Sequence, residues 1–316
     1  MIIKLKCQTC GAEQETPSDI IGFKCSYCGS PVVNIPNKYR ETSILCPDSI
    51  SVEETLRKIR RFLSSKVGDG YSIHRAFKFC LPIWRGRVKG RFRYKGYRKH
   101  TVTKTIKTGK TTTVKVETYY IPVEESIEVD RLIATPGRIN KDIYALDEIL
   151  DNAKRIKKYI ELNHMVINGW EPVIPEVSLE EARNLLDDLA EEELVREAEE
   201  RVDELLDYDA YLEVEQIELL YYPAIEFTYL YKGKRYRGIY DPVVGDVIRC
   251  EVPLGRWKRA LYALTSYIIL GALLAISILY RPTESLTIGH ILIAGGAGAL
   301  GTYTLIKATS SQEVYD

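Results

Sequence analysis

Two pairs of cysteines near the N-terminus constrain the fold of this chain more than any other feature. Cys7 and Cys10 form the first pair and Cys25 and Cys28 the second, and each pair has the spacing C-x-x-C followed by glycine. Two tight turns of this kind bring four thiolates to the corners of a tetrahedron, which is the coordination that zinc prefers. We therefore predict a zinc ribbon at residues 1–33 with one structural Zn²⁺, since four protein ligands leave no open coordination position.

The other cysteines are scattered singles at Cys46, Cys80 and Cys250. A disulfide-framed secreted domain has a denser and more regular pattern, so we expect a reducing compartment. The spacing does not say what the ribbon contacts. It could bind protein or nucleic acid, or it could only brace the terminus.

Two long uncharged runs near the C-terminus predict a transmembrane hairpin at 256–307, followed by a short tail at 308–316. Ala260–Tyr280 contains no charged residue, and His290 is the only ionisable residue of Ser285–Ile306. Each run exceeds the ~20 residues that a helix needs to cross a bilayer. The alternative is a pair of buried core helices.

The cations beside these runs predict their orientation. Arg256, Lys258 and Arg259 precede the first run and Lys307 follows the second. Cytoplasmic flanks of membrane helices are enriched in Lys and Arg. We expect a two-pass protein of the cytoplasmic membrane with both termini in the cytoplasm.

Between the ribbon and the hairpin we predict an α+β cytoplasmic domain at 51–255, rich in antiparallel β-structure, after a proline-containing linker at 34–50. A capping-box start at Ser51 and helical spacing predict a helix at 51–66. Within the domain we further expect a basic β region at 81–120, an acidic helical region at 176–218 and a β-sheet at 219–252.

Six cations alternate with other residues inside the basic region, which predicts a strand with one basic face. We call them the basic row: Arg85, Arg87, Lys89, Arg91, Arg93 and Lys95. Same-face neighbours about 6.7 Å apart repel one another unless anions lie nearby. The candidate anions are the acidic segment Glu176–Glu218, lipid headgroups, a nucleic-acid backbone and a protein partner.

The segment 107–112 resembles half of a phosphate-binding loop, but Lys104 stands where the first glycine of that loop should be. Because β-branched runs flank it at 101–106 and 111–119, we predict a β-hairpin that turns at Gly109. We identify no catalytic residues. None of the four histidines has a plausible catalytic carboxylate or serine partner in the sequence, and adjacent acids such as Asp187 and Asp188 fit a solvated helix face.

The order of these parts resembles a prokaryotic family of zinc-ribbon membrane proteins, which have a transcription-factor-IIB-type or primosomal-helicase-like ribbon, a mixed cytoplasmic region and C-terminal spans. The matching segments are the four cysteines, Leu81–Trp84, Tyr120–Val123, Tyr231–Tyr236 with Pro223, and Glu251–Pro253. No Walker motif supports a helicase. The resemblance implies a membrane anchor for envelope-stress partners, such as an ESCRT-III-like phage-shock protein or an SPFH scaffold.

We therefore expect a non-enzymatic membrane-anchored scaffold or adaptor that contacts membrane lipids and other membrane-associated proteins and has no small-molecule substrate. The alternative is a membrane-tethered nucleic-acid-binding protein that uses the ribbon and the strand 85–95. A third possibility is a subunit whose active site another chain completes. The balanced charge, 44 basic against 44 acidic residues, does not choose among them, and the low Gln and Met content favours a thermophilic source.

Overall fold

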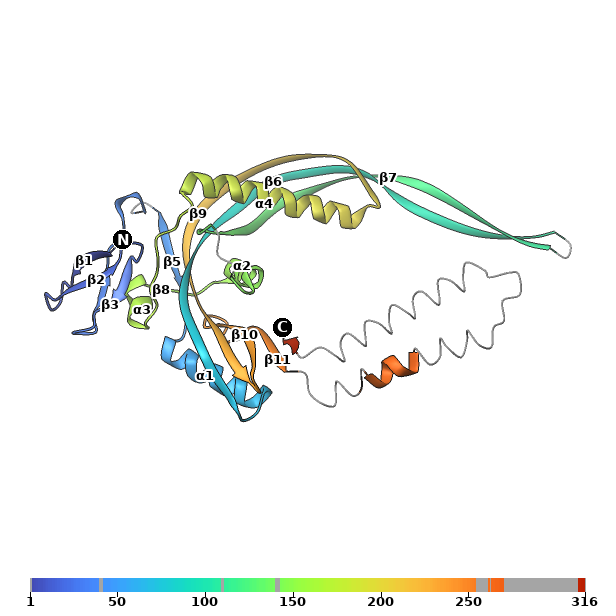
Figure 1. Ribbon diagram of the computed structural model, residues 1–316. Helices are drawn as coiled ribbons and strands as arrows, with labels where there is room; N and C mark the ends of the chain where they lie inside the picture. Colours follow the sequence, from blue (N-terminus) through green and yellow to red (C-terminus); the bar gives the residue numbers. More distant parts are fainter. Residues whose placement is uncertain are drawn as a thin grey trace. The chain divides into compact units, whose positions relative to one another are not determined.

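The computed structural model describes residues 2–39, 42–108, 111–139, 143–253, 261, 263–269 and 312–315 (Figure 1). The chain divides into two compact units. The first comprises Met1–Leu56, Phe77–Glu226 and Asp241–Asp246, and the second comprises Arg57–Ala76, Phe227–Tyr240 and Val247–Asp316. Each unit is described by itself.

The first unit begins with two short β-hairpins, as the zinc-ribbon prediction requires. Strand β1 (Ile2–Lys6) pairs with β2 (Glu13–Pro17), and β3 (Gly22–Lys24) pairs with β4 (Pro31–Val33). Phe23 and Val32 form a small core with two of the cysteines. So small a core stabilises a fold weakly, and modules of this size usually need a metal or disulfides.

The ribbon is fastened to the rest of the first unit by backbone hydrogen bonds. Ile21 donates its amide to the carbonyl of Pro172 at 2.9 Å, and Ile174 donates to the carbonyl of Asp19 at 2.7 Å. Arg138 adds an ion pair with Asp19 at 2.9 Å. The ribbon therefore contacts the rest of the first unit directly and is not joined to it by a linker alone.

A very long antiparallel hairpin dominates the first unit. Strand β6 (Tyr71–Thr108) pairs with β7 (Thr111–Pro136) in one unbroken register, from Ile83 opposite Pro136 to Thr108 opposite Thr111. The last pair confirms the predicted β-hairpin, whereas the turn predicted at Gly109 lies outside the described residues. The hairpin is much longer than the two strands expected around this turn.

A third strand supports only part of this hairpin. Strand β9 (Glu204–Tyr231) begins beside residues 96–99, where the amide of Lys99 donates to the Asp203 carboxylate at 2.7 Å. From there towards the turn, the described part of the chain contributes only β6 and β7 (Figure 1). We call residues 97–121 the arm. Its strands extend about 30 Å beyond β9 at ~3.4 Å per residue.

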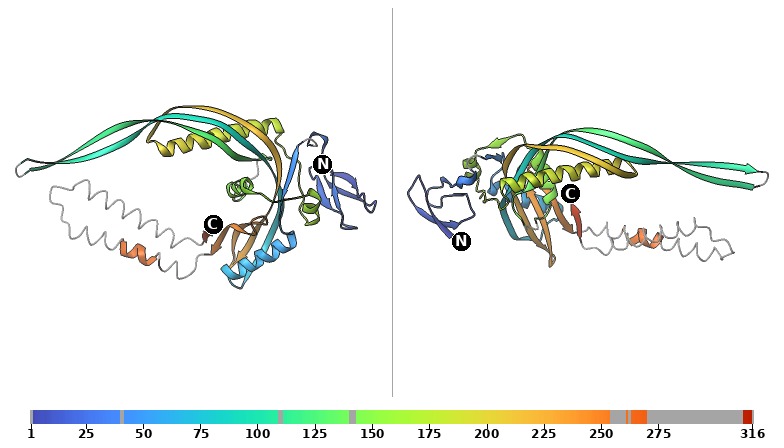
Figure 2. Two further views of the ribbon diagram at one scale, coloured as in Figure 1. Left: turned by 180° about the vertical axis from the view of Figure 1, so that it is seen from behind. Right: turned by 90° about the horizontal axis from the view of Figure 1, so that it is seen from above.

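Helix α4 (Leu179–Arg201) lies along one face of the supported part of the hairpin (Figure 2). Ser178 caps it in a capping box with Glu181. The buried stripe consists of Ala182, Leu186, Ala190, Leu194 and Ala198. It packs against Val88, Phe92, Tyr94, Val129 and Ile133 of the hairpin and against Val214 of β9. Small alanines alternate with leucines, so the helix can lie close to the sheet.

The acidic helical region predicted at 176–218 is only partly helical. Helix α4 ends at Arg201, and residues from Glu204 onward belong to β9. The physical reason is that the spacing of the apolar residues changes from helical to alternating. Apolar side chains in this segment recur at every second position: Leu206, Tyr208, Ala210, Leu212 and Val214. That alternation fits a strand rather than a helix.

The predicted linker 34–50 is also structured. It contains a 3₁₀ turn, Asn37–Tyr39, and strand β5 (Ser43–Pro47), which runs parallel to β9 from Ser43 opposite Glu218. Strand β8 (Tyr159–Ile160) pairs antiparallel with the other edge of β5. The sheet is therefore mixed: it is rich in antiparallel pairs, as predicted, and contains one parallel pair, β5 with β9. The apolar run of β5 that pairs with β8 and β9 consists of Ile44, Leu45 and Cys46.

The remaining helices of the first unit are short. They are helix α2 (Leu146–Arg155) and helix α3 (Leu162–Ile167). Met165 and Val166 of α3 are fully buried, and α3 packs on β3 and β4 of the ribbon. Helix α1 (Val52–Lys66), predicted at 51–66, begins in the first unit and continues into the second.

The second unit contains the last part of β9, then β10 (Lys234–Asp241), β11 (Asp246–Pro253) and β12 (Gln312–Tyr315) in that order across the sheet. Lys232 and Gly233 both have positive φ, at 51° and 76°, as a tight two-residue turn between β9 and β10 requires. The core is aromatic, with the rings of Tyr229 and Tyr236 stacked at 5.3 Å.

The two predicted membrane spans lie outside the described residues, apart from residues 261 and 263–269, which are helical. Among the residues that the structure describes, no helix combines the length and the apolarity needed to cross a bilayer.

Candidate metal centre and the basic row

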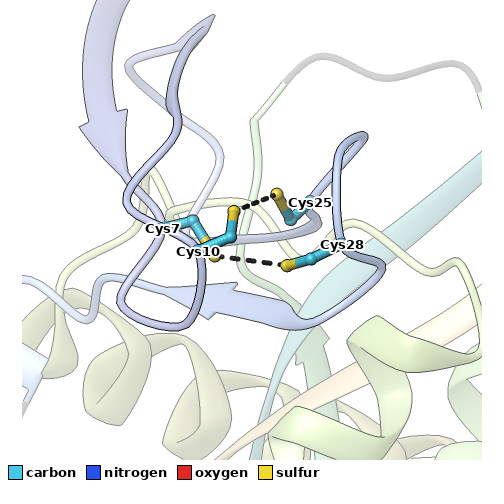
Figure 3. Close-up of side chains that lie close together, drawn as sticks. All are labelled: Cys7, Cys10, Cys25 and Cys28. Atoms are coloured by element: carbon cyan, nitrogen blue, oxygen red, sulfur yellow. Dashed lines mark hydrogen bonds between the residues drawn. The ribbon is translucent and has the colours of Figure 1, made fainter.

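The four cysteines of the ribbon converge on one point (Figure 3). Cys7 and Cys10 come from the turn between β1 and β2, and Cys25 and Cys28 from the turn between β3 and β4. The sulfur of Cys7 lies 3.7 Å from that of Cys28, and the sulfur of Cys10 lies 3.8 Å from that of Cys25. All four sulfurs lie within 4.8 Å of one another.

These distances match a tetrahedral metal site. Four sulfurs at 2.3 Å from a central zinc ion, placed at tetrahedral corners, are about 3.8 Å apart. The cluster can therefore hold one metal ion, and its all-thiolate donor set suits zinc. The four ligands predicted from the sequence are the four that the structure brings together.

The two cysteine turns are built in the same way. In the first turn the amide of Gly11 donates to the carbonyl of Cys7 at 2.9 Å, and in the second the amide of Gly29 donates to the carbonyl of Cys25 at 2.9 Å. The two glycines have φ of 77° and 75°. This left-handed conformation is strained for residues with a Cβ, which explains the glycine after each second cysteine.

Polar groups of the turns favour the thiolate form of Cys7 and Cys28. The amide of Ala12 also lowers the pKa of Cys10, but burial and the sulfurs of the other three cysteines raise it to about 12. Backbone amides of Cys10 and Thr9 lower the pKa of Cys7. The hydroxyl and amide of Ser30 lower the pKa of Cys28 to about 6. Metal binding requires deprotonated sulfur, so these hydrogen bonds prepare the site for a cation.

The structure places the basic row on β6 and supplies carboxylates to most of it. Five of its six cations form ion pairs: Arg85 with Glu218, Arg87 with Asp130, Lys89 with Glu215, Arg91 with Glu128, and Lys95 with Glu124. Arg93 has no carboxylate partner among the described residues. The row therefore has little unbalanced charge to offer an external anion, and its binding to a partner stays a prediction.

Arg85 differs from the rest of the row because it is buried. Only 5% of its side chain is exposed, against 44% to 59% for its ion-paired neighbours in the row. Besides Glu218 it donates to the hydroxyl of Tyr159 at 2.7 Å and to the carbonyl of Ala153 at 3.2 Å. It joins β6 to β9, β8 and α2, so its role is structural.

Three of the neutralising carboxylates come from β7, which sequence reasoning did not consider as a source of partners. The signal was present, because acids occur at 124, 128 and 130 on one face of the strand. Counting outward from a turn at Gly109 pairs Lys95 with Glu124 and Arg91 with Glu128, as the register shows. Glu215 and Glu218 come from the acidic segment that was proposed.

One further acid is buried in the first unit. The Asp241 carboxylate is fully buried and accepts hydrogen bonds from the hydroxyl of Tyr222, the amide of Asn152 and the backbone amides of Val243 and Val244. Burial raises its pKa, and these donors oppose that rise. Two of these donors are backbone amides of the turn that follows β10, so the Asp241 carboxylate stabilises that turn.

A cavity of about 540 Å³ lies between the ribbon and β6, lined in part by Pro17, Ile20 and Phe79. Two of its charged residues already have partners: Lys78 pairs with Glu171 at 2.7 Å, and Arg138 with the ribbon's Asp19. Within the described residues, the four cysteines form the only group of metal-ligating side chains close enough to share an ion.

No protein-family model matches this chain, and comparison with curated proteins and with solved structures gives no significant match. What the sequence and structure establish together is a four-cysteine cluster on two β-hairpins, consistent with a zinc ribbon, joined to a curled mixed sheet.

Proposed function

We propose that this chain is a non-enzymatic scaffold or adaptor, held at the cytoplasmic membrane by the runs 260–280 and 285–306, which recruits cytoplasmic proteins to the inner face. The arm is the observation that supports this most. An isolated two-stranded hairpin has little core of its own, and free strand edges readily pair with other chains. A projection of this kind suits contact with a partner rather than catalysis.

The described part of the first apolar run supports the tether. Residues 263–269 are helical, and Leu264, Tyr267 and Ile268 expose 57%, 74% and 63% of their surface. Large apolar side chains that are exposed together mark contact with lipid or with another protein. The cations that precede this run favour a cytoplasmic location for the bulk of the chain.

The metal in this proposal is one structural Zn²⁺. All four coordination positions are taken by cysteine, which leaves none for a substrate. Zinc binding contributes about 10–16 kcal/mol in small modules of this type. Because Ile21 and Asp19 bond to the segment around Pro172, the metal would hold this end of the first unit in place as well as the ribbon.

Helix α4 offers a surface for a protein partner. Asp187 and Asp188 are exposed, and neither has a basic partner among the described residues. Partial burial, with the charges of Asp188 and Glu191, raises the pKa of Asp187. A basic surface would relieve this repulsion. The resemblance to zinc-ribbon membrane proteins suggests membrane-remodelling or envelope-stress proteins as the partners.

Affinity capture of the full-length protein from its native membrane, with mass spectrometry, tests this proposal. We expect a stoichiometric protein partner whose recovery falls in the variant Asp187→Asn/Asp188→Asn. The matched control is Asp69→Asn, an exposed acid in the loop after α1, which should leave recovery unchanged. Recovery of no stoichiometric protein would overturn the proposal. Recovery of only nucleic acid and its handling proteins would favour the nucleic-acid alternative.

A further inference from the structure

The hairpin β6–β7 changes character where the arm begins. Before Tyr97, the face that carries the basic row is covered by exposed ion pairs. From Tyr97 to Ile121 it exposes large apolar and aromatic side chains instead. The exposed fractions are 60% for Val116, 48% for Tyr119, 56% for Tyr120 and 49% for Ile121.

The charge changes at the same point. The arm sequence contains six Lys or Arg residues and one acid, Glu117. In its described part, Lys115 pairs with Glu117 at 2.8 Å. Lys99 has no carboxylate partner among the described residues, and its ammonium lies over the ring of Tyr120 at 6.0 Å. At the base of the arm, Arg98 pairs with Glu125 at 3.6 Å. The arm is therefore a basic, aromatic-rich surface with few ion pairs, whereas five of the six cations of the basic row are ion-paired.

The register places Tyr97, Lys99, Val116 and Tyr120 on one face of the arm, and Tyr119 and Ile121 on the opposite face. Tyr97 stands opposite Pro122 and Lys99 opposite Tyr120, and the rings of Tyr97 and Tyr120 meet edge to face at 6.2 Å. Tyrosine has an apolar ring and a polar hydroxyl, which suits the boundary between headgroups and acyl chains. Lysine beside it can reach a lipid phosphate while its stem stays in contact with the ring.

We propose that the arm lies on an anionic bilayer surface, with Tyr97, Tyr120 and Val116 at the interface and Lys99 at the lipid phosphates. This inference rests on the proposed membrane tether and names what the arm contacts. Charge complementarity selects the partner. Two arms of adjacent copies would repel each other, because each has a net charge of about +5 from its sequence.

Nucleic acid is a weaker fit to the same surface. A phosphate backbone would neutralise the cations, but the aliphatic side chain of Val116 would gain nothing from it. Burial of Val116 with the rings of Tyr97 and Tyr120 in the interfacial region is favourable and adds to the electrostatic attraction. A bilayer would therefore interact favourably with both the cations and the apolar side chains of the arm.

The test uses the full chain in nanodiscs and a tryptophan reporter. Tyr120→Trp is made in a Trp257→Phe background, since Trp257 lies just before the predicted span and would itself report lipid. Trp84 and Trp170 are fully buried and give a constant signal. Brominated phosphatidylcholine, with or without phosphatidylglycerol, serves as the quencher.

We expect quenching and a blue shift of the reporter in discs that contain phosphatidylglycerol, and little in phosphatidylcholine alone. Each cation near an anionic surface changes the ratio of bound to free arm by about fivefold. Lys99→Gln should lower the ratio by about that factor, and Lys4→Gln, an exposed cation of the ribbon, should not. A reporter at Tyr211→Trp, 67% exposed on β9, should stay unquenched.

The outcomes separate this inference from the proposed function. If the chain enters the discs but the Tyr120→Trp reporter is not quenched, the arm proposal is wrong and the tether stands. If the chain does not enter the discs, both fail. An absence of quenching together with a rise in anisotropy on adding a short duplex would assign the arm to nucleic acid instead.

Discussion

Arg85 donates a 2.7 Å hydrogen bond to a carboxylate oxygen of Glu218 from a site where 5% of the arginine side chain is exposed. The two residues lie 133 positions apart in the sequence, on β6 and β9. The same row contains exposed pairs of similar geometry, such as Arg87 with Asp130 at 2.6 Å. One hairpin therefore allows a direct comparison of buried and solvated ion pairs.

We predict that Glu218→Gln destabilises the protein by about 3 kcal/mol, because it leaves a buried guanidinium without its counter-charge. Asp130→Asn, the matched exposed change, should have a much smaller effect, since water solvates the freed Arg87. Chemical denaturation followed by circular dichroism measures both. Equal effects of the two changes would show that the burial of Arg85 does not determine the strength of its pair.

The metal centre gives a prediction on stoichiometry. The purified protein should contain one zinc ion per chain, and Cys10→Ser should lower that content and the melting temperature together, because the ribbon has almost no core without metal. Cys46→Ala, a buried cysteine outside the cluster, should keep the zinc. Elemental analysis with thermal unfolding provides the check. Full zinc content in Cys10→Ser would exclude this residue as a ligand.

The contact between Tyr222 and Asp241 predicts a pH-dependent effect. Burial holds the pKa of Asp241 above its ordinary value, so the native state binds this proton more tightly than the unfolded state. The contribution to stability is greatest below the unfolded pKa of ~3.9 and falls as pH rises through the folded value. The hydroxyl of Tyr222 lowers the folded pKa and so limits this loss.

Tyr222→Phe should therefore destabilise the protein more at pH 7 than at pH 4. At pH 7 the change removes a hydrogen bond to a buried carboxylate, which is worth about 2 kcal/mol. At pH 4 the acid is closer to neutral and the bond is weaker. Urea unfolding at the two pH values makes the comparison. An effect that is the same at both, or larger at pH 4, would contradict this account.

The close approach of β9 to β6 gives a fourth prediction. A Cβ added to Gly90 would lie 1.9 Å from the carbonyl oxygen of Tyr211, and this glycine has φ of 152°. Because the contact is with backbone, Gly90→Ala must displace β9, at a cost of about 3 kcal/mol or more. Denaturation experiments and near-ultraviolet circular dichroism would report the shift. The control is Lys89→Ala, at the exposed residue beside Gly90, which should not displace β9.

Local features of the sequence determined the metal ligands, the hairpin of β6 and β7 and the start of α1. Each depends on residues close together in the chain: two C-x-x-C-G turns, β-branched runs on both sides of a glycine, and a cap followed by helical spacing. The backbone geometry that these patterns need leaves few alternatives. They were therefore predictable without knowledge of the tertiary structure.

Other features depended on which segments meet. The sequence left the partner of the basic row open among the acidic segment of the same chain, lipid, nucleic acid and a protein, because its carboxylate partners come from β7 and β9, far along the chain. The segment 34–50 looked like a linker, because a five-residue strand shows its role only when it pairs with β9. The end of α4 was missed because acidity was given more weight than the change from helical to alternating spacing at residue 204. The charge and apolarity of a segment indicate which kind of side chain it will contact. Only the tertiary structure decided which other segment provides those side chains.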